Sequence, residues 1–220
     1  MKRVSVCFAV TFALALASGQ ASAKIISGSI TGGTVLGRGT FVQLNPGAGA
    51  FTVGKDNFNT NNFYAFDERQ NVVLTQVLAA TFGVKNIAIG TRINSHFVFF
   101  DPLATQTLQG NIAFDTPVLS AITLRPALIA SNYLGAAGVT YLTPGSVGLE
   151  PGIDFVALGS PGPDGLRVNF FSADTPGDHF RVITLADAVP EPASWAMMVA
   201  GFVGVGNVAR KRRAIKIVFA

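Results

Sequence analysis

The stretch Arg92-Ile-Asn-Ser-His-Phe-Val-Phe-Phe100 decides how the central part of this chain folds. Because successive side chains of a β-strand point to opposite faces, an extended chain here has one strongly apolar face and a second face that becomes apolar toward its end. The pattern predicts a central strand of a β-sheet. The two faces carry Ile93, Ser95, Phe97 and Phe99 on one side and Asn94, His96, Val98 and Phe100 on the other.

Similar short segments, rich in Val, Ile, Phe and Thr, lie on both sides of this stretch and are separated by clusters of Gly, Pro, Asn and Asp. Their spacing is typical of an antiparallel β-sandwich, so the predicted fold class is all-β, jelly-roll-like, with one short helix at residues 126–134. The predicted strands are residues 24–30, 34–44, 62–66, 72–77, 86–89, 92–100, 111–114, 118–124, 155–158, 166–171 and 179–185.

The charge of the chain is concentrated at its ends. The whole sequence carries a formal net charge of +4. Residues 24–189 contain nine Lys or Arg against eleven Asp or Glu, a net charge of −2. The central part has no run of basic residues, which argues against a nucleic-acid partner.

The N-terminus has the three parts of a secretory signal peptide. Met1-Lys-Arg3 is basic, residues 4–17 are apolar, and Ala21-Ser-Ala23 carries small residues at the two positions that signal peptidase reads. We expect a signal helix, export by Sec-type machinery and cleavage after Ala23. The single cysteine, Cys7, lies in the apolar part, so the mature protein has no disulfide and no cysteine-based zinc site.

The C-terminus combines a proline-bracketed carboxylate, an apolar segment and a basic cluster. Pro190 and Pro192 hold Glu191 in an extended conformation of the kind that proteases and transpeptidases bind. Residues 195–209 contain no charge and predict a membrane helix, although at 1.5 Å per residue they span only ~22 Å of a hydrocarbon core of ~30 Å. The helix begins at Trp195, which suits the membrane interface, and is followed by cations that favour the cytoplasmic side. These cations are Arg210, Lys211, Arg212 and Arg213.

This arrangement resembles the PEP-CTERM sorting signal of Gram-negative bacteria in its PEPxxWA form. The resemblance implies recognition by an exosortase, a membrane transpeptidase-like enzyme, during export linked to extracellular polysaccharide. Carried over to this chain, it assigns recognition to Pro190, Glu191 and Pro192, and transient retention in the inner membrane to residues 195–209 with the basic cluster.

These observations divide the chain into five parts. They are a signal peptide at residues 1–23, a β-sandwich at 24–185, a linker with the sorting motif at 186–194, a membrane helix at 195–209 and a basic cytoplasmic tail at 210–220.

The central domain offers little that predicts catalysis. Ser95, His96 and Asp101 contain the residue types of a hydrolase triad, but adjacent strand residues point to opposite faces, so Ser95 and His96 cannot cooperate. His179 follows the turn sequence Thr-Pro-Gly-Asp178. We therefore expect no enzyme and no catalytic cofactor.

Two binding sites remain open as predictions. Asn57, Asn59, Asn61 and Glu68 stand at positions 1, 3, 5 and 12 of a calcium-loop pattern, but the glycine required at position 6 is Asn62. Structural calcium in irregular loops, with Asp67, Glu68, Glu150 or Asp154 as other ligands, stays an alternative to ordinary polar turns. Tyr64 is the one candidate for a carbohydrate contact, because carbohydrate-binding surfaces usually present Tyr or Trp, and cross-strand packing is the favoured alternative for it.

The predicted function is that of an exported protein with a structural or adhesive role at the cell surface or in the extracellular matrix. Association with exopolysaccharide or biofilm follows from the family resemblance alone. Two alternatives remain. A carbohydrate-binding module requires an exposed aromatic platform or a groove lined by Asn and Asp, and a secreted hydrolase requires two carboxylates or a Ser–His pair that converge in a cleft.

Overall fold

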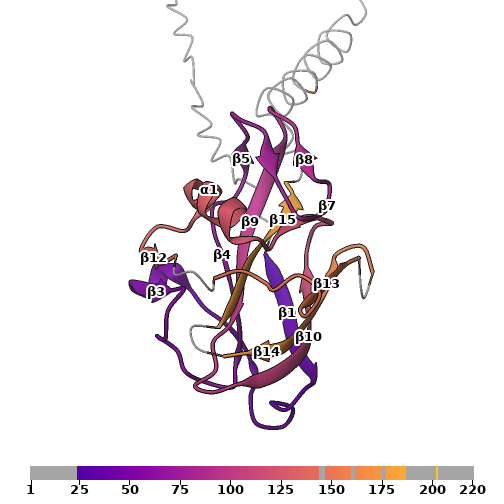
Figure 1. The fold of residues 1–220 in the computed structure, drawn as a ribbon. Coiled ribbons are helices and arrows are strands. Elements are labelled where there is room, and N and C mark those ends of the chain that lie inside the picture. Colours follow the sequence, from indigo (N-terminus) through magenta and orange to yellow (C-terminus); the bar gives the residue numbers. More distant parts are fainter. Residues whose placement is uncertain (1–23, 144–146, 160–161, 175–176, 187–201, 203–220) are drawn as a thin grey trace, which may run out of the picture. The chain divides into compact units, whose positions relative to one another are not determined.

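The computed structural model describes residues 24–143, 147–159, 162–174, 177–186 and 202 (Figure 1). Residues 21–187 form one compact unit. The predicted signal peptide, the sorting motif, the predicted membrane helix and the basic tail lie outside the described residues, apart from Ala186 and Phe202.

Two β-sheets form the domain, as the sequence predicts for an all-β sandwich. The first is antiparallel throughout and has the strand order β1 (Ile25–Gly32), β10 (Gln106–Phe114), β14 (Gly165–Ala173) and β13 (Phe155–Leu158). We call it the four-stranded sheet.

The second sheet contains the decisive stretch as strand β9. We call it the seven-stranded sheet; its order is β2 (Phe41–Gln43), β4 (Phe63–Asp67), β9 (Arg92–Phe100), β15 (Asp178–Leu185), β11 (Val118–Ile122) and β7 (Phe82–Gly83), with β5 (Val72–Val73) also paired to β9. Only the β2–β4 pair is parallel.

Short elements cover the outer face of the seven-stranded sheet or extend its loops. They are η1 (Pro46–Ala48), β3 (Phe51–Val53), which pairs in parallel with β12 (Val139–Tyr141), β6 (Leu78–Ala79), which pairs with β8 (Asn86–Ile87), α1 (Arg125–Ala130) and η2 (Asn132–Leu134).

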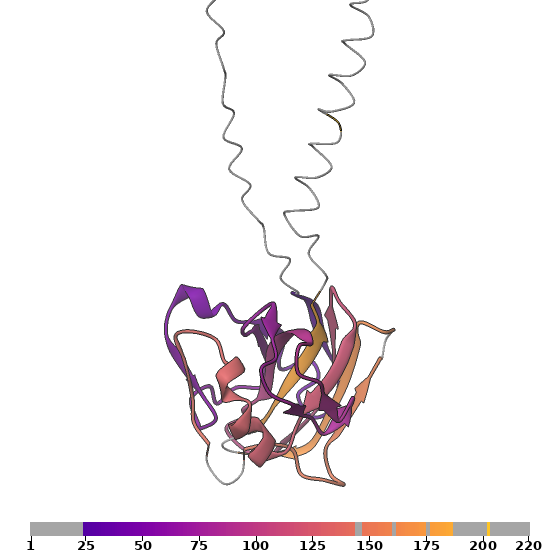
Figure 2. The same cartoon turned by 90° about the horizontal axis from the view of Figure 1, so that it is seen from above.

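The seven-stranded sheet is buried on both faces. One face packs on the four-stranded sheet through a core that includes Phe63, Val98, Phe100, Phe114 and Phe180. The opposite face packs under α1, η2 and the β3–β12 pair through a second core that includes Phe66, Phe97, Phe99, Leu128 and Leu134. In Figure 2, β15 accordingly lies between α1 on one side and β13 and β14 on the other.

The prediction of a central strand at residues 92–100 is confirmed. Every residue from Ile93 to Phe100 is buried, and β9 lies between β4 and β15. The polar residues on its two faces are buried with it, since the second core covers the face that holds Ser95. Burial of polar side chains requires hydrogen-bond partners, and β9 finds them in the neighbouring strands.

Most of the other predicted strands and the predicted helix are also present, with two differences. The predicted strand at residues 34–44 is reduced to the short β2, because residues 34–38 form a turn in which the Val35 carbonyl accepts from the amides of Arg38 and Gly39, and Gly33 and Gly37 adopt positive φ of 88° and 76°. Strand β10 begins at Gln106 rather than residue 111, and passes through Gly110. A Cβ atom there would lie 2.9 Å from the Phe63 ring, so this glycine serves the contact between the sheets rather than a turn.

A buried ion pair joins the seven-stranded sheet to its helical cover. Arg181 of β15 donates from Nε to Oε2 of Glu68 at 2.5 Å and from Nη2 to Oε1 at 2.8 Å. Its Nη1 donates to Ser131 Oγ at 2.5 Å and to the Leu128 carbonyl at 3.2 Å. Ser95 Oγ donates to the same glutamate at 2.5 Å. Both charged side chains are fully buried.

Aromatic rings complete the surroundings of this pair. The guanidinium carbon of Arg181 lies 5.5 Å from the centre of the Phe97 ring and 5.6 Å from that of Tyr141. Burial alone lowers the pKa of Arg181, but the charge of Glu68 outweighs it and the pKa is raised above its ordinary value. The arginine therefore stays charged inside the core.

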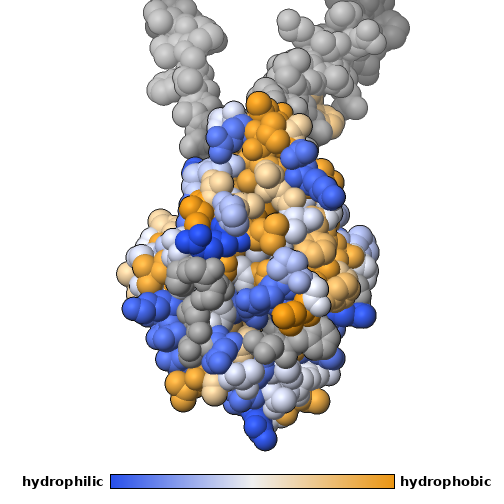
Figure 3. All heavy atoms as spheres, viewed as in Figure 1, coloured by the Kyte–Doolittle hydropathy of each residue, from blue (hydrophilic) through white to orange (hydrophobic). Residues whose placement is uncertain are grey.

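Residues 72–91 form one end of the domain, and several apolar side chains of this segment are exposed. Figure 3 shows hydrophobic surface at the end where Figure 1 labels β5 and β8. The exposed side chains of this segment are Val73, Val77, Phe82, Val84 and Ile89.

We predict that Arg181→Met destabilises the domain by about 3–5 kcal/mol, because Glu68 is left buried without a counter-charge. The double variant Glu68→Leu/Arg181→Met should lose less than the single variant, since no lone charge remains. Urea unfolding measures both, with exposed Arg38→Met as the matched control. Equal losses for the single and double variants would contradict this account of the ion pair.

Candidate functional site

The outer face of the four-stranded sheet carries a polar groove with a volume of about 430 Å³. Strand alternation creates it. Leu108, Ile112 and Val156 face the core, which turns their neighbours on the same strands outward. The lining residues are Thr31 of β1, Gln109 and Asn111 of β10, Arg167 and Val168 of β14 and Phe155 of β13.

Sheet register brings these groups together. Asn111 pairs with Ser29 on one side and with Arg167 on the other, and Arg167 pairs in turn with Ala157 of β13. Amide, hydroxyl and guanidinium groups therefore line one row across adjacent strands, and Phe155 lies two residues from Ala157 along β13. We call this surface the outer groove.

Two features of the outer groove point to a ligand. The side chain of Phe155 is 48% exposed and presents an apolar ring beside polar groups. Asn111 Oδ1 is buried and has no hydrogen-bond partner. Buried polar atoms are normally paired, so an unpaired acceptor in the wall of the groove is an exception that a ligand would explain. The combination offers an apolar ring face with hydrogen-bonding groups on one side of it.

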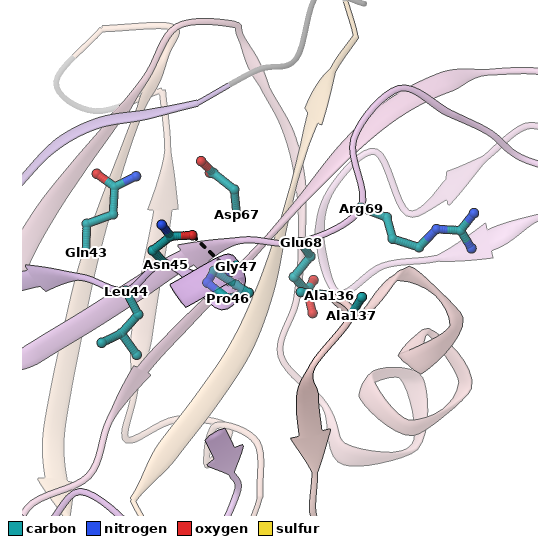
Figure 4. Close-up of a pocket in the computed structure, with 10 residues that line it drawn as sticks. All are labelled: Gln43, Leu44, Asn45, Pro46, Gly47, Asp67, Glu68, Arg69, Ala136 and Ala137. Carbon is teal, nitrogen blue, oxygen red and sulfur yellow. Dashed lines mark hydrogen bonds between the residues drawn. The ribbon is translucent and has the colours of Figure 1, made fainter. Parts of the chain in front are cut away.

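A second cavity, of about 630 Å³, lies between η1, the end of β4 and the loop at residues 136–137 (Figure 4). Several of its polar side chains are already engaged within the protein. Asn45 Oδ1 accepts from the Gly47 amide, Glu68 binds Arg181, and Arg69 donates to the Tyr133 carbonyl. This cavity therefore offers a ligand fewer free polar groups than the outer groove does.

The histidine His96 lies in a hydrogen-bonded chain with Asp67 and Thr184. Its Nδ1 is 2.7 Å from Asp67 Oδ1 and its Nε2 is 3.1 Å from Thr184 Oγ1. The order carboxylate, imidazole, hydroxyl is that of a hydrolase triad. However, His96 and Thr184 are both completely buried between β-strands, so no substrate reaches the hydroxyl. The chain links β4, β9 and β15 as a structural element.

The fold gives the other two residues of the candidate triad, Ser95 and Asp101, different partners. Ser95 donates to Glu68 on the opposite face of β9 from His96, as strand alternation predicts. Asp101 Oδ2 accepts from the amides of Asn57 and Phe58, at 3.2 and 3.0 Å. Its carboxylate thus holds the Asn-rich loop.

His179 is also buried. Its Nδ1 is 3.1 Å from the Gly177 carbonyl, and its ring stacks on Phe99 at 5.4 Å. Burial lowers the pKa of His179 to about 4, so the ring is neutral at physiological pH.

The structure corrects the expectation for Tyr64. Its side chain is 6% exposed and its ring stacks on Phe99, with centroids 4.9 Å apart. The hydroxyl binds Thr60 and Asn62. A sugar stacks on an exposed ring face, and this ring has none.

The predicted calcium loop also has a different arrangement. Glu68, its ligand at position 12, is bound to Arg181 and Ser95 within the second core. Asn59 adopts a positive φ of 50° and donates to the Asp56 carbonyl, as in a polar turn. Asn57 and Asn61 therefore lose the acidic partner that the pattern assigns to them.

A different set of acids lies together. Carboxylate oxygens of Glu150, Asp154 and Asp178 lie within 4.8 Å of one another. Among the described residues, these three acids are the potential metal ligands that the fold brings close together. Two of these residues belong to the turn before β13, and Asp178 begins β15.

Comparison with known proteins addresses the C-terminal segment. A family model for the PEP-CTERM protein-sorting motif matches residues 188–213. The chain carries a PEP-CTERM sorting signal. No curated protein and no solved structure was found to match the chain.

The PEP-CTERM signal identifies the chain as an exported protein, targeted to the cell surface and processed by an exosortase-type enzyme. It leaves the central domain, with its outer groove, without a family assignment. Among the residues that the structure describes, none belongs to a helix long and apolar enough to cross a membrane. The membrane segment predicted at residues 195–209 lies outside them, except for Phe202.

Sequence reasoning on this PEP-CTERM protein missed the outer groove. Its residues are dispersed over four strands between Thr31 and Val168, and none belongs to a recognisable motif by itself. The available signal was the alternation in Leu-Gln-Gly-Asn-Ile112, which places two amides on one face. Strand register, which the sequence does not give, was needed to add Arg167 and Phe155.

We predict that the free energy of unfolding, measured in a metal chelator, falls between pH 6.5 and 8. Burial, together with the charges of Asp154 and Glu150, raises the pKa of Asp178 to about 8 from its usual 3.8. The folded state then holds a proton that the unfolded state has released, and this stabilisation is lost as the pH rises through 8, at up to about 1.4 kcal/mol per pH unit.

Urea unfolding at several pH values measures this slope. His179 is neutral in the folded state across this window, but in the unfolded state it still loses its proton near pH 6.5, which raises the free energy of unfolding with pH and opposes the Asp178 slope at the lower end only. Asp178→Asn should flatten the profile. An equal slope in the wild type and the variant would show that Asp178 is not its source.

Proposed function

We propose that the exported domain acts as a structural or adhesive protein at the cell surface, and that it binds matrix polysaccharide through the outer groove. The sorting signal supports delivery to the surface, where exopolysaccharide is the abundant partner implied by the family resemblance. The observation that carries the proposal is the exposed Phe155 ring beside the unpaired Asn111 acceptor.

The chemistry of the outer groove suits a sugar chain. A sugar ring has apolar C–H faces, which pack on an aromatic ring, and hydroxyls, which bind amides such as Gln109 and Asn111. Arg167 adds a planar cation that binds carboxylates with two parallel hydrogen bonds. We therefore propose an acidic polysaccharide as the preferred ligand.

The residues that line the outer groove support binding of a polysaccharide rather than its hydrolysis. Its described lining consists of Thr31, Gln109, Asn111, Phe155, Arg167 and Val168, which includes no carboxylate and no histidine. Acid–base groups are the means of glycoside hydrolysis. An extended face on one sheet also allows several sugars of a long chain to lie across neighbouring strands.

We predict that the purified protein is retarded in native gels that contain alginate, an acidic polysaccharide, and less in gels that contain neutral dextran. Arg167→Ala and Phe155→Ala should each weaken the retardation by alginate about tenfold, equivalent to ~1.4 kcal/mol.

Matched exposed residues elsewhere provide the controls. Lys85→Ala removes a cation and Ile89→Ala removes apolar surface, both outside the groove. If the groove variants migrate like the wild type, the outer groove is not the binding site. If alginate and dextran retard the wild type equally, the ligand preference is not for acidic polysaccharide.

A second prediction concerns sorting. Glu191→Ala should leave a longer, membrane-bound precursor, because the processing enzyme loses the carboxylate of its recognition motif. Neutral replacements of residues 210–213 should weaken retention in the membrane. Immunoblots of membrane and medium fractions follow both, with Asp187→Ala as the control acid just before the motif. Unchanged release of the Glu191 variant would contradict this assignment of the motif.

A further inference from the structure

We infer that Glu150, Asp154 and Asp178 form a calcium-binding site, which is independent of the proposed polysaccharide binding. The three carboxylates come from two places in the chain and meet where the turn before β13 approaches the start of β15.

The buried carboxylate of Asp178 indicates a ligand. Its side chain is only 3% exposed, and its Oδ2 has no hydrogen-bond donor. A buried carboxylate oxygen without a partner is strongly unfavourable. When Asp178 is itself protonated it can donate to Glu150, and a cation replaces that proton with a stronger interaction.

Burial and the neighbouring charges act in the same direction on Asp178. Burial, together with the charges of Asp154 and Glu150, raises the pKa of its carboxyl to about 8. Burial and Asp154 likewise raise the pKa of Glu150. Three acids in this arrangement therefore compete for protons unless a positive ion lies between them.

The turn holds the Asp154 carboxylate and the Glu150 backbone in place before any ion binds. Asp154 Oδ2 accepts from the Glu150 amide at 3.0 Å, and the Glu150 carbonyl accepts from the amides of Ile153 and Asp154 at 3.1 Å. Gly152 provides the positive φ of 89° that closes the turn. Ordering this turn thus adds little to the entropic cost of binding.

The donor set selects the ion. All three ligands are carboxylate oxygens, which suit hard cations such as calcium and magnesium rather than zinc or copper. Oxygens bound to calcium at 2.3–2.6 Å can lie up to about 5 Å apart, so carboxylate oxygens within 4.8 Å of one another fit its flexible coordination, whereas magnesium demands near-ideal octahedral geometry. Glu150 is exposed, so water can complete the coordination.

The site would add a cross-link to a domain that has no disulfide. The mature sequence lacks cysteine, and an ion shared by Glu150, Asp154 and Asp178 ties the turn before β13 to the seven-stranded sheet. Extracellular calcium modules bind with dissociation constants of roughly 10⁻⁴–10⁻³ M. We expect this partly exposed site to bind calcium in the same range.

The experiment uses the full-length chain, purified in mild detergent and treated with EGTA. Equilibrium dialysis with radioactive calcium should show one bound ion per chain. Calcium at ten times its dissociation constant should raise the melting temperature by about 3–6 °C, and magnesium at the same concentration should raise it less. Calorimetry at pH 7 in buffers of different ionisation enthalpy should show release of protons on binding.

Asp178→Asn and Glu150→Gln should each abolish the bound ion, the thermal shift and the proton release, whereas Asp164→Asn, outside the cluster, should keep all three. Glu150 is exposed, so its variant decides the matter if the Asp178 variant does not fold. Wild-type protein without bound calcium, or both variants binding like the wild type, would overturn the inference. A magnesium shift equal to that of calcium would overturn the choice of ion.

Discussion

The fully buried pair of Arg181 and Glu68 is the interaction on which the two-core architecture depends. Glu68 follows β4 and Arg181 lies on β15, 113 residues later, and the arginine also binds Ser131 after α1. One guanidinium therefore fixes the distance between the seven-stranded sheet and the elements that cover it. Without that cover, Phe97, Phe99 and Phe66 would face water, and the sheet would be an ordinary half of a sandwich.

The sequence predicted the sheet-forming segments well because strand periodicity is local. Residues 92–100, 155–158 and 179–185 all have their own alternation and lie in strands close to the predicted limits. The failures arose where distant residues decide the conformation. The strand predicted to begin at residue 111 in fact runs through Gly110, which lacks a side chain where the Phe63 ring of the other sheet approaches. The second core was not predicted at all, since β3 and β12 are only three residues long.

The site was predictable in its chemistry but not in its position. A groove with Asn side chains was the stated requirement for carbohydrate binding, yet Tyr64 was named because tyrosine suits sugars, and its neighbours in the fold turned out to be Phe58 and Phe99. Glu150 and Asp154 were recognisable as possible ligands. Asp178 was assigned to a turn, because only strand pairing brings the start of β15 to the loop at residue 150. The sorting motif, by contrast, is read as a linear peptide, so its recognition needed no fold.

Strand β15 is the last strand that the structure describes, but it lies in the middle of the seven-stranded sheet, between β9 and β11. A polypeptide that leaves the cell from its N-terminus therefore cannot close this sheet until residue 185 has emerged. The strands before β15 stay incompletely paired until then, and an unfolded chain of this kind suits passage through a narrow channel. The PEP-CTERM signal begins at residue 188, immediately after the strand that completes the domain, so the order of emergence places maturation of the fold just ahead of the processing step.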